Sequence, residues 1–281
     1  MRVIYGPVPS WRLGRSLGVD PLGGGEKRCT FDCLYCQLGP TPHGPVLRDT
    51  WVDSATLAEE LQASRARAVD HVTFAGMGEP TLAANLGYLL RVAHHVGGSP
   101  VAILTNASLL GDPEVRAAVR LADRLVVKLD AATEAGFLAV NRPRIPCTFA
   151  EVLDGIRAVR DEYTGFLALQ MMFIAENRAQ AGSMAALARS LDPDGVFLNT
   201  PLRPSPAPPL PAAAMQEIAR AFEGLHISQV YDAGRPAAAP LDVDATRRRR
   251  PEHPDSNGAG ACQTVVMAPS RRPCGMYRGR G

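Results

Sequence analysis

The sequence has little lysine and little net charge. Two of its 281 residues are lysine, and its 30 lysine and arginine residues nearly balance 28 aspartate and glutamate residues. A formal charge of +2 is too small to indicate a nucleic-acid-binding or membrane-surface protein from composition alone. The sequence also lacks any run of about 18 apolar residues, so it predicts no membrane-spanning helix. Its first residues lack the apolar core of a signal peptide, and we therefore expect a cytoplasmic protein.

Cysteine is scarce and unevenly placed. Six cysteines in a chain of this length are too few for a disulfide-stabilised scaffold. Three of them, Cys29, Cys33 and Cys36, lie within eight positions, and in a reducing compartment such crowding indicates a metal site. The remaining composition is that of a globular protein, because 46% of the residues are apolar and can form the core of one or two compact domains.

Short β-branched segments alternate with helical patterns along most of the chain. This alternation is typical of βαβ units and predicts an α/β protein with a parallel sheet. The helical patterns have recognisable ends, such as the Asp112-Pro113 start signal and the Gly97-Gly98 stop signal. An open doubly wound sheet and a partial barrel both fit the spacing. The expected strands are 16–20, 71–75, 101–105, 124–129, 166–174 and 196–200.

The composition changes after residue 231 to alanine, proline, glycine and arginine. We expect residues 1–232 to form the folded domain and residues 233–281 to form a flexible, largely disordered tail, because the tail has no apolar period to bury. The tail is basic, since residues 247–281 contain eight arginines and two acidic residues. Its four-arginine run at 247–250 fits either a solvated segment or a sequence-independent contact with RNA phosphates.

The clustered cysteines admit two metal sites. Thiolates suit both zinc and iron-sulfur clusters, and three on one polar loop converge on one small inorganic group. A structural zinc site normally has four protein ligands, so His43 is the candidate to complete a Cys3His site. A cluster with one open position needs only the three cysteines.

The segment from Cys29 to Cys36, with Tyr35 directly before the last cysteine, resembles the cluster-binding loop of the radical S-adenosylmethionine (SAM) superfamily. The resemblance implies that Cys29, Cys33 and Cys36 hold three irons of a 4Fe-4S cluster and leave the fourth iron open to SAM. It also implies the superfamily's architecture, a partial (β/α)6 barrel of the TIM type. The cysteines and the polar motifs described next fall at the carboxyl ends of expected strands. Parallel α/β folds build their sites at these ends.

Further motifs follow in the order of that superfamily. The segment from Gly76 to Pro80 resembles the Gly-Gly-Glu-Pro motif that holds the methionine amino group, with Met77 in place of the first glycine. Polar residues at the ends of the next two strands resemble those near the ribose and carboxylate of SAM. Asn106 is equally consistent with a turn residue, and Asp130 with a helix cap. The resemblance thus assigns cofactor binding to Tyr35, Gly76, Gly78, Glu79, Thr105, Asn106, Lys128 and Asp130.

Within the superfamily, the segment from Gly6 to Gly18 resembles the start of an iron-sulfur oxidoreductase group related to wyosine-type tRNA-modifying enzymes. We expect an oxidoreductase or transferase that generates a 5'-deoxyadenosyl radical, with an external electron donor of the flavodoxin or ferredoxin type and an unidentified substrate. Arg12, Arg15, Arg142 and Arg203 are candidates to bind an anionic substrate. The alternatives are a zinc-stabilised α/β binding or hydrolytic protein and an RNA-modifying module recruited through the arginine-rich tail.

Overall fold

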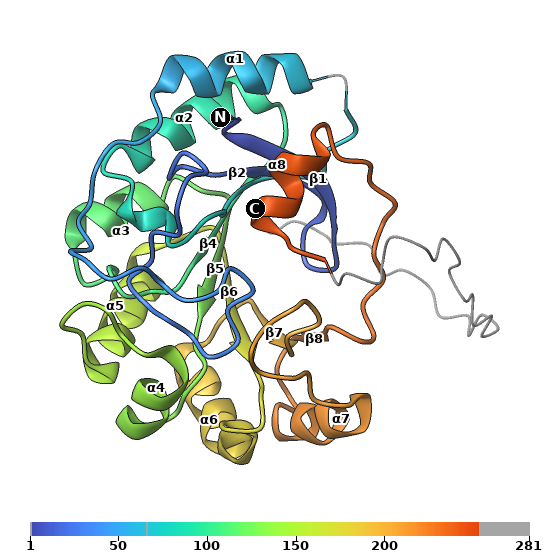
Figure 1. Ribbon diagram of the computed structural model, residues 1–281. Coiled ribbons are helices and arrows are strands. Elements are labelled where there is room, and N and C mark those ends of the chain that lie inside the picture. The colour runs from blue at the N-terminus through green and yellow to red at the C-terminus, as the bar shows by residue number, and fades with distance from the viewer. Residues whose placement is uncertain (1, 66, 253–281) are drawn as a thin grey trace, which may run out of the picture.

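The computed structural model describes residues 2–65 and 67–252, which form one curved sheet with helices along its outer side (Figure 1). The strands lie in chain order from β1 to β8. Neighbouring strands are parallel from β2 onward, whereas β1 is antiparallel to β2. The strands are β1 Ile4–Ser10, β2 Gly14–Val19, β3 His71–Phe74, β4 Val101–Thr105, β5 Arg124–Lys128, β6 Phe166–Met172, β7 Gly195–Asn199 and β8 Ile227–Gln229.

Helices alternate with the parallel strands, and several of them begin at a residue whose side chain caps the first turn. Asp112 accepts a hydrogen bond from the backbone of Glu114 at the start of α3, and Thr148 forms a capping box with Glu151 at the start of α5. None of the helices in the described ranges is long and apolar enough to cross a membrane. The helices are α1 Ser54–Ser64, α2 Leu86–Gly97, α3 Pro113–Val119, α4 Glu134–Asn141, α5 Phe149–Glu162, α6 Ala181–Leu191, α7 Ala212–Ala221 and α8 Val243–Arg249.

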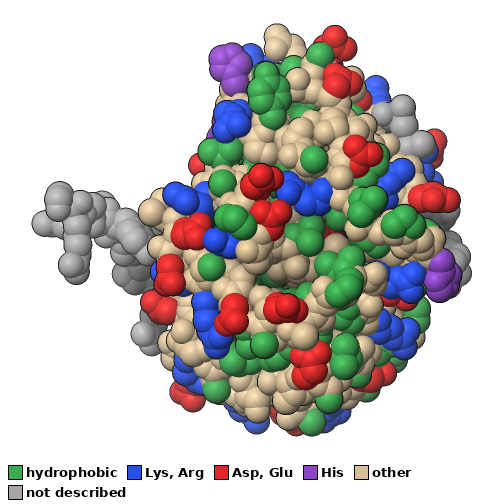
Figure 2. Space-filling view, turned by 90° about the vertical axis from the view of Figure 1, so that its left-hand side faces the viewer, with side chains coloured by type: hydrophobic (Ala, Val, Ile, Leu, Met, Phe, Trp, Pro, Cys, Tyr) green, Lys and Arg blue, Asp and Glu red, His purple; other side chains and the backbone are tan. Residues whose placement is uncertain are grey.

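The main core lies between the sheet and the surrounding helices. Strands β4, β5 and β7 are buried on both faces over most of their length, as expected for parallel strands covered by helices. Truncating a fully buried core side chain such as Leu125 or Leu169 to alanine costs about 2–5 kcal/mol. On the outer surface, Figure 2 shows acidic, basic and apolar side chains intermingled on the face in view.

The expected α/β partial barrel is confirmed. The six expected strands correspond to β2–β7, and in the part of the chain that is described no pairing joins β8 back to β1, so the barrel stays open. The edge strands were not expected. β1 contains Pro7 and Pro9, which an edge strand tolerates because one side of its backbone needs no partner, and its register shifts between Tyr5 and Val8.

The expectation of a flexible tail is wrong for its first part. Residues 243–249 form α8, which packs against β1 (Figure 1). The backbone N–H of Gly6 donates to Thr246 Oγ1 at 2.9 Å, and Arg249 is 1% exposed. α8 is held in place by a buried, paired arginine rather than by an apolar stripe. A search for apolar periodicity does not detect such a helix. The rest of the expected tail, residues 253–281, lies outside the described residues.

Candidate active site

The three clustered cysteines follow β2 and line one cavity of about 190 Å³ at the carboxyl ends of the strands. This cavity, called here the sulfur-lined cavity, brings together residues from β2 to β6. Gly76 and Asp130 are not among the residues that line it. The other residues expected to bind a cofactor all line it, namely Tyr35, Gly78, Glu79, Thr105, Asn106 and Lys128.

The thiols of the sulfur-lined cavity are partly buried. Burial raises the pKa of Cys29 to about 12, and the neighbouring Cys33 and Glu79 act in the same direction. Burial also raises the pKa of Cys33, although Lys128 opposes this. The Asn106 side chain donates to Cys29 Sγ at 3.6 Å. The raised pKa values favour the protonated thiols. A bound metal cation would instead favour the thiolates, because it stabilises their negative charge directly.

The cysteine loop is joined to the expected glycine-rich motif by its backbone. Arg28 N–H donates to the carbonyl of Met77 at 2.8 Å, and Glu79 N–H donates to the carbonyl of Arg28 at 2.9 Å. Gly78 adopts a φ of +152°, and a Cβ added there would overlap the Arg28 carbonyl group. Only glycine allows this close approach. The motif therefore fixes the position of the loop that carries Cys29.

Glu79 organises the wall of the cavity. Its side chain is buried and accepts hydrogen bonds from the hydroxyls of Thr81 and Thr105, each at 2.7 Å. The backbone N–H of Asn106 donates to its second oxygen at 2.6 Å. Burial raises the pKa of Glu79, while these donors favour its ionised form. Both oxygens have protein partners, so Glu79 holds the ends of β3 and β4 together.

A second polar network centres on Asp130. Lys128 Nζ lies 3.1 Å from Asp130 Oδ2, and the Tyr35 hydroxyl donates to the same oxygen. Burial disfavours the charge on Lys128, but Asp130 and Cys33 outweigh burial and hold the pKa of Lys128 above its usual range. Burial, with Asp130 beside it, also holds the pKa of Tyr35 well above its ordinary value, so Tyr35 donates as a neutral phenol.

Sequence reasoning missed two residues of the site. Gln170, on β6, lines the sulfur-lined cavity opposite Lys128 in the strand register. Its polar side chain inside an apolar strand is a signal by which the sequence could have identified it. Asn177 donates to the backbone carbonyls of Asp130 and Met172, each at 2.8 Å. It lies in a loop that carries no comparable signal.

The zinc interpretation is not supported by the position of its fourth ligand. His43 is exposed, its Nδ1 lies 3.1 Å from Arg144 Nη2, and it faces a different cavity from Cys33 and Cys36. Among residues 2–65 and 67–252, no three His, Cys, Asp or Glu side chains gather closely enough to hold a single metal ion.

Comparison with known proteins agrees with this geometry. The model of the radical SAM superfamily matches residues 27–188, and the chain belongs to this superfamily of enzymes. Such enzymes use SAM and an iron-sulfur cluster, and the expectation drawn from the cysteine loop is thus confirmed at this level. Within it, the chain is one of the UPF0026 proteins. It is 39% identical to UPF0026 protein slr1464 of Synechocystis sp. over 72% of this chain and 77% of that one.

Two further comparisons extend the likeness. A UPF0026 protein of Methanocaldococcus jannaschii is 32% identical over 73% of this chain, which spans 65% of that relative's length. Among solved structures, TYW1 with a lysine-pyruvate adduct bound superposes with a TM-score of 0.58 at 15% identity, covering 74% of this chain and 73% of the other. At this identity the likeness to TYW1 establishes the fold alone.

Proposed function

We propose that this enzyme holds a 4Fe-4S cluster on Cys29, Cys33 and Cys36 and uses it to cleave SAM reductively. The observation that carries the proposal is that the three thiols and Glu79 line the same cavity at the carboxyl ends of parallel strands. Backbone hydrogen bonds tie the cysteine loop to the Glu79 motif, so both parts of the site keep fixed relative positions.

The donor set fits such a cluster. Iron-sulfur clusters are held by thiolates, and three thiolates leave one corner of a four-iron cube without a protein ligand. An open position is what separates a catalytic metal site from a structural one. The same cavity contains Gln170 Oε1, a buried atom without a hydrogen-bond partner among the described residues. Such an atom is expected where a wall faces a ligand.

When bound, the cluster supplies one electron to SAM, and cleavage yields methionine and a 5'-deoxyadenosyl radical that removes a hydrogen atom from the substrate. The residues of the chain itself bind and orient SAM. Glu79 fixes Thr105 and Asn106 before SAM enters, and Leu104 and Val126 give the cavity an apolar wall. We assign SAM binding to Tyr35, Gly76, Gly78, Glu79, Thr105, Asn106, Lys128 and Asp130.

We propose that an external one-electron donor of the flavodoxin or ferredoxin type reduces the cluster, as the resemblance to the superfamily implies.

Anaerobic reconstitution with iron and sulfide tests the proposal. We expect a brown protein with about four irons per chain that releases 5'-deoxyadenosine from SAM after reduction. Cys33→Ala should lose the chromophore and the product. Cys147→Ala is the matched control, because Cys147 is a half-buried thiol that does not line the sulfur-lined cavity. Stoichiometric zinc without iron, or a Cys33→Ala protein with unchanged chromophore, would overturn the proposal.

A further inference from the structure

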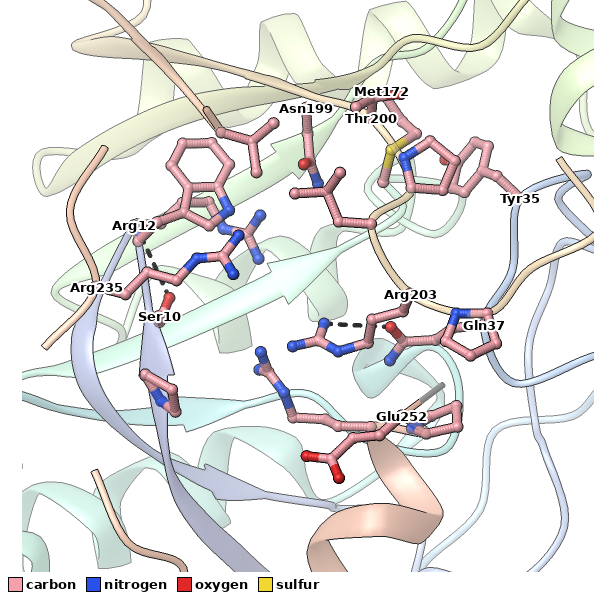
Figure 3. Close-up of a pocket in the computed structure, with 18 residues that line it drawn as sticks. Ser10, Arg12, Tyr35, Gln37, Met172, Asn199, Thr200, Arg203, Arg235 and Glu252 are labelled. Carbon is pink, nitrogen blue, oxygen red and sulfur yellow. Dashed lines mark hydrogen bonds between the residues drawn. The ribbon is translucent and has the colours of Figure 1, made fainter. Parts of the chain in front are cut away.

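A second cavity of about 380 Å³ lies beside the first, with Tyr35 in the wall of both. It is formed by the loop after β1, the loop after β7 and the segments on either side of α8. Four arginines line it: Arg12, Arg203, Arg235 and Arg250. In Figure 3 the guanidinium groups of Arg12, Arg203 and Arg235 turn toward the same hollow. We call it the arginine cavity.

The positive charge of the arginine cavity is not balanced by the protein around it. Glu252 is the only carboxylate among its described lining residues, and its Oε2 lies 3.8 Å from the Nε of Arg247, outside the cavity. Arg203 donates to the neutral Gln37 at 3.3 Å. The Nε of Arg12 is buried and has no hydrogen-bond partner within the described structure. Cations with little access to water are normally paired, so this half-buried cluster is suited to bind an anion.

The arginines also disfavour one another's charge. Burial lowers the pKa of Arg12 to about 9, with Arg250, Arg203 and Arg235 contributing in that order. Burial lowers the pKa of Arg203 to about 9 as well, and Arg250 and Arg235 add to the effect. An anion placed among these groups would offset this repulsion and favour their charged form.

We propose that the arginine cavity binds the phosphate or pyrophosphate group of a small-molecule substrate. This rests on the proposed function, because Tyr35 links the arginine cavity to the sulfur-lined cavity in which SAM reacts. A substrate anchored by its phosphate among the arginines presents its remaining atoms past Tyr35. The arginines select and orient the substrate, and the 5'-deoxyadenosyl radical reacts with the part that reaches the sulfur-lined cavity.

Several features favour a phosphate ester over other anions. Four guanidinium groups are more hydrogen-bond donors than one carboxylate can use. The oxygens of a phosphate accept several paired N–H donors at once. The cavity volume falls in the range of small-molecule sites, which is about 300–1,000 Å³. A nucleic-acid surface would instead use exposed cations, and in the 247–250 run Arg249 is buried in an ion pair with Asp20.

Titration calorimetry with inorganic pyrophosphate tests the proposal on the full-length reconstituted protein. We expect saturable binding at one site, weakened at least about tenfold in Arg203→Gln and in Arg235→Gln, because each loses a charge-assisted contact. Arg235 is exposed, so its substitution should leave folding intact even where Arg203→Gln does not. The control is Arg248→Gln, which removes one charge from an exposed position of α8 off the cavity and should bind within about twofold of the parent.

Each alternative has its own outcome. The proposed anion site would be overturned if pyrophosphate did not bind, or if Arg248→Gln weakened pyrophosphate binding as much as the substitutions in the cavity do. Equal affinity for citrate would overturn the phosphate preference. Binding of a 5'-hydroxyl RNA oligonucleotide without binding of pyrophosphate would overturn the small-molecule class. Iron content and 5'-deoxyadenosine release are measured on the same samples. If iron content and 5'-deoxyadenosine release are lost while pyrophosphate still binds, the anion site is supported and the proposed function is contradicted. If pyrophosphate binding is lost while iron content and 5'-deoxyadenosine release are retained, the anion site alone is overturned.

Discussion

Arg249 Nε lies 2.8 Å from Asp20 Oδ2, and both side chains are fully buried. This ion pair joins the last described helix to the end of β2, directly before the cysteine loop. Asp20 also packs against Gly76, where an added Cβ would overlap the Asp20 carboxyl group. The Arg249 carbonyl accepts a hydrogen bond from Gln37, one residue after the last clustered cysteine, at 2.9 Å. α8 thus braces both motifs of the proposed cofactor site.

Breaking this pair should strongly destabilise the protein. Arg249→Met leaves the Asp20 carboxylate buried without its cation, and we expect the free energy of unfolding to fall by about 3–5 kcal/mol in urea denaturation. Arg248→Met, on the exposed side of the same helix, should change it by less than about 0.5 kcal/mol. Adding Asp20→Asn to Arg249→Met should recover part of the loss. An Arg249→Met protein as stable as the parent would mean that the pair contributes nothing.

Gly78→Ala should displace the cysteine loop. The new Cβ collides with the Arg28 carbonyl at a backbone conformation that alanine rarely adopts, so we expect a loss of more than about 1 kcal/mol of stability and poor iron incorporation. Gly182→Ala is the matched control. Gly182 lies on α6 with open space around its Cα, and alanine there should stabilise the helix by about 0.5–1 kcal/mol. Full iron content in Gly78→Ala would contradict the role of the close approach.

The Tyr35→Phe variant removes the hydroxyl of Tyr35 and keeps its aromatic ring, so it tests the two parts of the side chain separately. The buried Asp130 carboxylate loses one donor but keeps Lys128 and Asn141, so we expect a loss of about 1 kcal/mol in thermal or urea unfolding. The ring that both cavities share remains. Iron content and pyrophosphate affinity should therefore match those of the parent. A change in pyrophosphate affinity would mean that the hydroxyl itself contacts the anion.

The Arg15–Asp70 pair predicts a pH effect. Hydrogen bonds from the Arg15 side chain and backbone hold the pKa of Asp70 well below its usual range. A lowered carboxyl pKa stabilises the fold above the unfolded-state pKa of about 3.9, and this contribution disappears as the pH falls further. The stability gap between the parent and Asp70→Asn should therefore be largest near neutral pH and shrink below about pH 4. A gap that stays constant with pH would exclude this linkage.

Ionic strength provides the control for that experiment. Both side chains of the Arg15–Asp70 pair are partly exposed, so salt should narrow the gap at neutral pH. If the gap instead reflected packing of Asp70 against Gly14, salt would leave it unchanged.

The central sheet and the sulfur-lined cavity were predictable because their signals are local. Each central strand is an apolar run bounded by turn residues, and the strand of residues 101–105 matches β4 at both ends. The thiols were recognisable because their spacing is contained in eight residues. Of the candidate arginines, Arg12 and Arg203 meet in one cavity, whereas Arg15 pairs with Asp70.

The parts that sequence reasoning missed depend on distant partners. β8 has three residues, two of them exposed, which gives no alternating pattern to detect. α8 is stabilised by an ion pair that spans most of the chain, and Arg235 and Arg250 reach the arginine cavity only because α8 is folded onto β1. A pairing of this kind has no local spacing, so composition alone made the segment resemble a tail.

The dependence of the first strand on α8 has a consequence for biosynthesis. The cysteine loop and the strands around it emerge from the ribosome well before α8 is made. Both the sulfur-lined cavity and the arginine cavity therefore reach their final form only after α8 has been synthesised and has folded onto β1.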